Sequence, residues 1–195
     1  MPVTLAAIFP PTQPPERIGA VATAADAAGL AQLWVWEDCF KESGIATATA
    51  MLAATSQVHV AIGLLPVPLR NVALTAMEVA TLGRLFPGRL TAGVGPRTVS
   101  LAGELGDGVI IPGGVSPAEV RTAVGHFREG RAAGSGDVVV FVAVPADSPA
   151  ADVAAVANEY ASAGATHVAV NAVEDDADLV RFVRFLAAEV KPLLA

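Results

Sequence analysis

Residues 88–108 read GRLTAGVGPRTVSLAGELGDG, and this stretch decides how the chain folds. Its first half, from Gly88 to Val94, has the pattern of a short apolar strand that leaves a helix. Its second half, from Gly95 onward, has the pattern of a turn that opens a short helix, the kind of turn that binds phosphate groups. The stretch is the fourth of seven strand-then-helix units that follow one another. Strict alternation of this kind predicts a parallel α/β fold.

The seven predicted strands are short, apolar and bounded by proline, glycine or polar residues. They span residues 3–9, 33–36, 58–65, 90–94, 108–111, 138–144 and 167–170. The helices between them span residues 14–29, 43–56, 71–85, 96–105, 116–133 and 148–164, and a final helix to residue 194 starts at Asp175 or Asp176. No Gly/Ser-rich linker divides the chain. We therefore expect one domain over residues 1–195, a TIM-barrel-like (βα) fold with parallel strands, shortened to about seven units.

Composition excludes several classes of protein. Of the 195 residues, 53% are hydrophobic and 16% are charged, which suits a sheet buried on both faces. The net charge is −7 and no Lys/Arg cluster is present, which argues against a nucleic-acid or membrane partner. Cys39 is the only cysteine, so an internal disulfide is excluded and a cytoplasmic location is expected. The sequence shows no signal peptide and no membrane-spanning run.

Three segments then resemble the bacterial luciferase-like monooxygenase family. They are LWVWEDCF (residues 33–40), IGLLPVPLRN (62–71) and ATLGRLFPGRL (80–90), and GPRTVSLAGELGDG (95–108) resembles a later part of the family. The resemblance implies an oxidoreductase that uses FMN or a deazaflavin coenzyme, for monooxygenation or for hydride transfer to a small-molecule substrate. It also implies a homodimer that pairs through the second and third helices.

One departure from the family is large. A long segment usually separates the Gly-Arg-Leu strand from the Gly-Pro-Arg-Thr turn, and here the two are joined directly. The absent segment would have supplied part of the pocket wall and its lid. We expect residues 91–94 to bridge the gap by pairing in parallel with the strand at Ala61 on one side and with the strand at Val109 on the other.

The best candidate for a phosphate site is Gly95, Pro96, Arg97 and Thr98. Glycine allows close backbone approach, proline pre-sets the first helical turn, and the free N–H groups of that turn can bind an anion. Arg97 could add a charge-assisted contact. The alternative is a plain helix start with an exposed arginine.

The resemblance places the cofactor ring near Leu64 and Leu65, where family members often carry a non-prolyl cis peptide bond. Here that bond would be Gly63–Leu64 or Leu64–Leu65, and the alternative is a trans strand end closed by proline. Gly113 and Gly114 follow the fifth strand and could admit a ligand close to the backbone, or could simply turn the chain.

Glu37 and Asp38 are the candidate catalytic pair, because they follow the second strand where the family often places a polar residue facing the ring. Half-buried carboxylates can titrate abnormally, but carboxylates at strand ends also cap helices. Cys39 is expected to be a small buried hydrophobe.

One asparagine and two histidines also stand at strand ends. Asn171 could hydrogen-bond a ligand carbonyl. His59 and His167 begin their strands, so we expect them on the face away from the pocket, and the histidine spacing predicts no metal site.

Two alternatives to an active oxidoreductase remain open. A shortened barrel whose pocket is open to water could bind a flavin without turnover, or could be a minimised scaffold that binds no cofactor.

Overall fold

The structure is a computed structural model that describes residues 2–38, 40–66, 69–94, 99–131, 134 and 136–195. Strands and helices alternate along it, as predicted. The strands are β1 (Thr4–Ile8), β2 (Gln32–Val35), β3 (His59–Leu65), β4 (Leu90–Val94), β5 (Gly108–Ile111), β6 (Asp137–Val144) and β7 (His167–Ala172). The helices are η1 (Pro15–Arg17), α1 (Ile18–Ala27), α2 (Gly44–Ala53), α3 (Val72–Leu85), α4 (Val99–Leu105), α5 (Pro117–Gly130), α6 (Ala150–Ser162), α7 (Leu179–Phe185), η3 (Leu186–Val190, a π-helical turn) and η4 (Lys191–Leu193).

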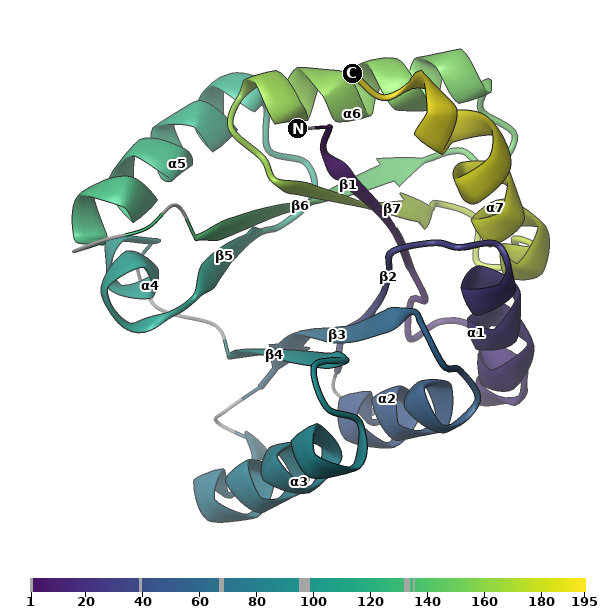
Figure 1. The fold of residues 1–195 in the computed structure, drawn as a ribbon, viewed down its shortest axis with the longest axis vertical. Helices are drawn as coiled ribbons and strands as arrows, with labels where there is room; N and C mark the ends of the chain where they lie inside the picture. Colours follow the sequence, from purple (N-terminus) through teal and green to yellow (C-terminus); the bar gives the residue numbers. More distant parts are fainter. Residues whose placement is uncertain (1, 39, 67–68, 95–98, 132–133, 135) are drawn as a thin grey trace.

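All seven strands form one parallel sheet in the order β4-β3-β2-β1-β7-β6-β5. Figure 1 shows this sheet curled on itself with the helices around its outside. The predicted fold class, a parallel TIM-barrel-like α/β fold of seven units, is therefore confirmed.

The barrel is open between β4 and β5, which we call the seam. Thr91 pairs with Ala61 as predicted, but β5 pairs only with β6, so the predicted second ladder to Val109 is wrong. A side chain rather than a backbone ladder spans the seam. A Cβ atom placed on Gly93 would lie 2.7 Å from Cδ1 of Ile110, so the Ile110 side chain fills the space between the two strands. Paired strands lie only about 4.8 Å apart, which leaves no room for it.

Side-chain caps explain where several helices begin. Ser43 accepts a bond from the N–H of Ala46 at the start of α2, and Ser116 and Glu119 form a complete capping box at α5. The last helix differs from the prediction, because Asp178 caps it rather than Asp175 or Asp176. The segment before it is held elsewhere, since the carbonyl of Asp175 accepts a bond of 2.7 Å from the Gln13 side chain.

Apolar side chains form two cores. The larger lies between the outer face of the sheet and the helices, and the smaller lies inside the barrel around Ala6, Ile8, Trp34, Ala61, Val139 and Ala169. Helix α3 is poorly covered, because of its residues only Leu82 is buried and Val72, Leu74, Met77 and Leu85 are exposed. Among the described residues, no helix combines the length and the apolarity that a bilayer crossing requires.

Candidate functional site

The barrel encloses a cavity of about 1060 Å³ that runs along the strands and opens into the seam. Strand β6 shows its extent, because Asp137, Val139, Phe141 and Ala143 all line it from one end of the strand to the other. Six residues of strand correspond to a length of about 20 Å. The cavity thus joins the amino ends of the strands to the carboxyl ends, where parallel α/β proteins bind ligands.

Aromatic rings fill the middle of this cavity. The Phe141 ring meets Trp34 edge-on at 5.5 Å between centroids and lies tilted against Trp36 at 6.2 Å. A Cβ atom on Gly63 would lie 2.7 Å from the tip of the Phe141 ring, so β3 needs glycine there for the ring to cross the barrel. The rings offer flat apolar surfaces against which a planar ligand can stack.

At the carboxyl ends, the cavity is lined by Leu64, Gly113 and Asn171. The Oδ1 atom of Asn171 is buried and has no hydrogen-bond partner among the described residues. A buried acceptor without a partner costs free energy, so it is expected to receive a donor from a ligand or a water molecule. The sequence drew attention to Asn171 as a donor to a ligand carbonyl, whereas the structure leaves its acceptor atom free.

The predicted ring-binding residues are separated by the structure. Leu64 lines the cavity, but Leu65 is buried in the outer core among the helices. The described residues contain no cis peptide bond, so the trans alternative holds at Gly63–Leu64 and Leu64–Leu65. The strand is nevertheless irregular here, because its register with β4 shifts between Ile62 and Leu65. Gly114 does not line the cavity and instead makes a left-handed turn with φ of 83°.

Some predicted site residues lie outside the described residues. These are the candidate phosphate-binding residues Gly95, Pro96, Arg97 and Thr98, and also Cys39.

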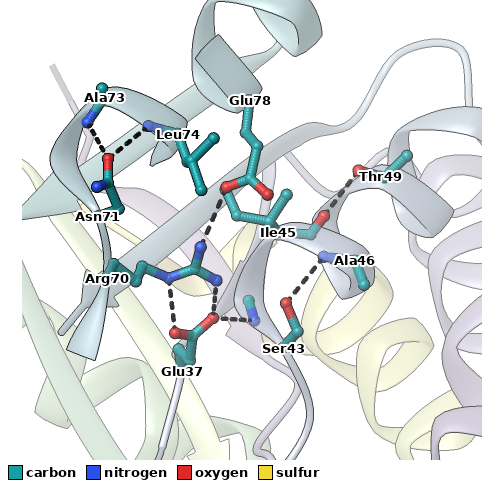
Figure 2. Close-up of polar contacts among 11 residues, drawn as sticks. Glu37, Ser43, Ile45, Ala46, Thr49, Arg70, Asn71, Ala73, Leu74 and Glu78 are labelled. Carbon is teal, nitrogen blue, oxygen red and sulfur yellow. Dashed lines mark hydrogen bonds and ion pairs between the residues drawn. The ribbon is translucent and has the colours of Figure 1, made fainter. Parts of the chain in front are cut away.

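Glu37 lies beside the carboxyl end of β2 in a network of ionic contacts (Figure 2). Arg70 donates through Nε to its Oε1 at 2.8 Å and through Nη2 to its Oε2 in a closer contact. The N–H of Gly44, the first residue of α2, donates to the same Oε2 at 2.9 Å. Arg70 also donates to Glu78 of α3 at 3.1 Å. Glu37 therefore connects the starts of α2 and α3.

These contacts determine the charge state of Glu37. The hydrogen bonds from Arg70 lower the pKa of the carboxyl group, burial works in the opposite direction, and the bond from Gly44 lowers it further. A general acid needs a raised pKa, so the geometry favours the helix-capping alternative for Glu37 over the catalytic one. Asp38 is exposed at the edge of the same loop.

The amino end of the cavity is polar, which we did not expect. Gln32, Thr91, Asp137 and His167 come from four strands and line it together, so the prediction that His167 faces away from the pocket is wrong. The cavity continues along the inside of the barrel to the starts of the strands. His59 lies beside this group, because one of its ring nitrogens bonds to Oγ1 of Thr91 at 2.8 Å.

Both histidines are held in the neutral form. Burial lowers the pKa of His59, and the charge of Arg89 lowers it further. Burial also lowers the pKa of His167, against a smaller opposite effect of the Asp137 carboxylate. At neutral pH these rings therefore act as hydrogen-bonding groups without charge.

Comparison with solved structures shows that the fold is a known one. An F420-dependent secondary alcohol dehydrogenase, solved with an F420–acetone adduct, aligns with a TM-score of 0.84 at 13% identity over 99% of both chains. An F420-dependent tetrahydromethanopterin reductase from Methanopyrus kandleri aligns with a TM-score of 0.80 at 14% identity over 100% of both chains. A monooxygenase from Streptomyces bottropensis aligns with a TM-score of 0.73 at 14% identity, covering 97% of this chain and 99% of its own. At these identities the likeness concerns the fold alone.

Sequence comparison is more specific for the first half of the chain. No protein with a curated description matches the sequence. The sequence profile of the luciferase-like monooxygenases matches residues 3–96, a range that includes the three segments on which the resemblance was based. Residues 3–96 therefore carry the sequence of the luciferase-like monooxygenase family, which confirms the resemblance.

Proposed function

We propose that the protein binds a flavin or deazaflavin coenzyme in the barrel cavity and works as an oxidoreductase of the luciferase-like kind. The observation that carries the proposal is the acceptor of Asn171, which has no partner among the described residues and lies at the carboxyl end of the cavity, beyond its aromatic middle. The pyrimidine edge of flavins and deazaflavins has an N–H group that could donate to it. The bound coenzyme would supply the hydride or oxygen chemistry, and the protein would bind and orient it.

The size and the lining of the cavity fit such a ring system. Ligand pockets usually measure about 300–1,000 Å³, and this cavity, at about 1060 Å³, is slightly larger than that range. Trp36 and Phe141 offer rings for stacking, and Gly113 leaves its backbone accessible, since a Cβ atom there would meet only ordinary contacts. The names of two structurally similar proteins include F420, which makes the deazaflavin the first coenzyme to test.

A melting experiment tests the proposal. Ligand at 100 times its dissociation constant adds about 2.7 kcal/mol of stability, which raises Tm by about 5–10 °C for a chain of this length. We expect this shift with F420 or with FMN, and we expect Asn171→Leu to reduce it. The matched control is Asn158→Leu on the outer helix α6, which should leave the shift unchanged. If neither coenzyme raises Tm of the unaltered protein, the proposal is wrong and the scaffold alternative gains.

Binding without turnover is the second candidate, and the seam favours it. No backbone ladder closes the barrel wall between β4 and β5, where among the described residues the Ile110 side chain fills the gap, whereas flavin chemistry usually needs water firmly excluded. Oxidation of the added reduced coenzyme separates the two candidates, since only an oxidoreductase makes the oxidation depend on a substrate.

We also propose that the protein is a homodimer that pairs through α3. Amphipathic helices gain most of their stability from burying an apolar face, yet Val72, Leu74, Met77 and Leu85 of α3 are between 60% and 71% exposed. Leu69, just before the helix, is also exposed, at 63%. An exposed apolar surface of this kind is typical of a protein–protein interface.

A further inference from the structure

The amino end of the cavity holds a second group of side chains that the coenzyme proposal does not use. Every charged side chain among the described residues that line the cavity is acidic, namely Asp107 and Asp137. No lysine or arginine of the described chain lines it. The two carboxylates favour a cationic ligand at this end over an anionic one.

Asp137 is the central residue of this group. It is the first residue of β6, and its carboxylate makes no ion pair with any described residue. Gly108 on the neighbouring strand makes room for it, because a Cβ atom at position 108 would lie 3.0 Å from Cβ of Asp137 and 2.6 Å from its carbonyl oxygen. The carboxylate also lines the cavity, so it is available to a ligand bound there.

His167 adds an acceptor next to Asp137. The Thr166 hydroxyl group lies 3.2 Å from the carbonyl of Val138 and 2.7 Å from Nδ1 of His167, so it can donate to the carbonyl and accept a bond from Nδ1. In the neutral ring this assignment leaves Nε2 as an acceptor. His59 is different, because Gly88 and Thr91 already bond both of its ring nitrogens.

Above these acceptors the cavity is apolar and aromatic. Ile8, Trp34, Val139 and Phe141 line it, and the indole N–H of Trp34 is already taken by the side-chain oxygen of Gln32 at 2.9 Å. A ligand body here would meet hydrocarbon and ring faces, and ring faces also attract cations.

We propose that the amino end of the cavity binds a small organic amine. The ammonium group would donate to the Asp137 carboxylate and to Nε2 of His167, and the apolar body would lie along Trp34 and Phe141. A carboxylate ligand would be repelled by Asp107 and Asp137, and an alcohol would lack the ionic attraction. The site shares the Phe141 ring with the proposed coenzyme position, but its polar groups lie at the other end of the cavity and its test needs no coenzyme, so it does not depend on the proposed function.

The test uses the purified full chain without coenzyme and three probes of equal length: hexylamine, hexanol and hexanoate. Binding is measured by calorimetry at pH 7.5. The Asp137 side chain is exposed, so water screens its attraction for an ammonium group; hexylamine should bind about 2- to 5-fold more tightly than hexanol, and hexanoate should bind most weakly. Equal binding of hexylamine and hexanol would overturn the proposal.

Variants locate the site. Asp137→Asn should weaken hexylamine binding about 2- to 5-fold and leave hexanol binding unchanged, and its melting curve shows whether the fold is intact. Asp152→Asn, an exposed aspartate on the outer helix α6, is the matched control and should bind as the unaltered protein does. Hexylamine should also change the tryptophan fluorescence, and Trp34→Phe should reduce that change. An unaltered affinity in Asp137→Asn, or an unaltered fluorescence response in Trp34→Phe, would place the amine elsewhere and refute the proposal.

Discussion

Replacing Glu37 by glutamine tests whether this residue supports the fold or takes part in proton transfer. The substitution removes a charge that receives two hydrogen bonds from Arg70 and one from the N–H of Gly44. The side chains of Glu37 and Arg70 are 13% and 18% exposed, so the pair is neither a surface pair nor fully buried. Exposed pairs contribute about 0–1 kcal/mol, and breaking a buried pair costs about 3–5 kcal/mol. We therefore expect Glu37→Gln to lower the free energy of unfolding by about 2–3 kcal/mol.

Urea unfolding and melting curves measure this loss. A change of 1 kcal/mol shifts Tm by about 2–4 °C for a chain of this length, so the expected drop is about 4–12 °C. Arg70→Met should cost a similar amount, and the double variant should cost clearly less than the sum, because both changes remove the same contact. Glu78→Gln is the matched control. Its side chain is 44% exposed and makes one contact of 3.1 Å with Arg70, so its loss should cost at most about 1 kcal/mol.

The pH dependence gives an independent check. Because the contacts lower the pKa of Glu37 in the folded state, its contribution to stability is complete above its ordinary value of 4.5 and is lost as the pH falls through the folded-state pKa. The difference in stability between the unaltered protein and Glu37→Gln should therefore shrink in acid. A cost below about 0.5 kcal/mol at pH 7, or additive effects of the two substitutions, would refute the structural role of Glu37.

Three further predictions follow from the strand interior, the histidines and α3. Gly93→Ala should lower the free energy of unfolding, measured in urea, by about 1–3 kcal/mol, because the new Cβ atom would lie 2.6 Å from a backbone oxygen of β3. Gly83→Ala is the control, because position 83 on α3 is in open space, and it should raise the free energy of unfolding by up to about 1 kcal/mol. Burial lowers the pKa of His59 and His167 below 6.5, so the unfolded state binds more protons than the folded state as the pH falls. The free energy of unfolding should therefore fall between pH 7.5 and 5.5, and it should fall less when both histidines are replaced by glutamine. Leu74→Lys should convert the proposed dimer to a monomer in light scattering, and a monomer in the unaltered protein would end that proposal.

The fold could be predicted from the sequence because its signals are local. Apolar strands bounded by glycine and proline, together with caps such as Ser43 and Ser116, mark the elements one by one. Alternation then fixes a parallel sheet without any knowledge of distant contacts. The predicted ladder between β4 and β5 is wrong because the Ile110 side chain lies against Gly93 and holds the two strands apart. No local sequence pattern predicts this contact.

The candidate site could be predicted less well, because its contacts join distant positions. Glu37 and Arg70 are 33 residues apart, so their pairing is invisible in the sequence and Glu37 looked free for catalysis. Likewise, Oδ1 of Asn171 has no partner among the described residues, and this depends on which residues pack around it in the fold, which the sequence does not show. The strands' inward-pointing residues do alternate from Asp137 onward, and following that alternation down to the strand start would have placed Asp137 in the cavity.

The order of the strands has a consequence for how the chain can be divided. The first and last strands, β1 and β7, lie side by side in the centre of the sheet, whereas its two outer edges come from the middle of the sequence. A break between Val94 and Val99 would yield one fragment with β1 to β4 and another with β5 to β7. When the two fragments are mixed, they should reassociate along β1 and β7. A circular permutant, in which the original termini are joined and the new termini lie at that break, should also fold.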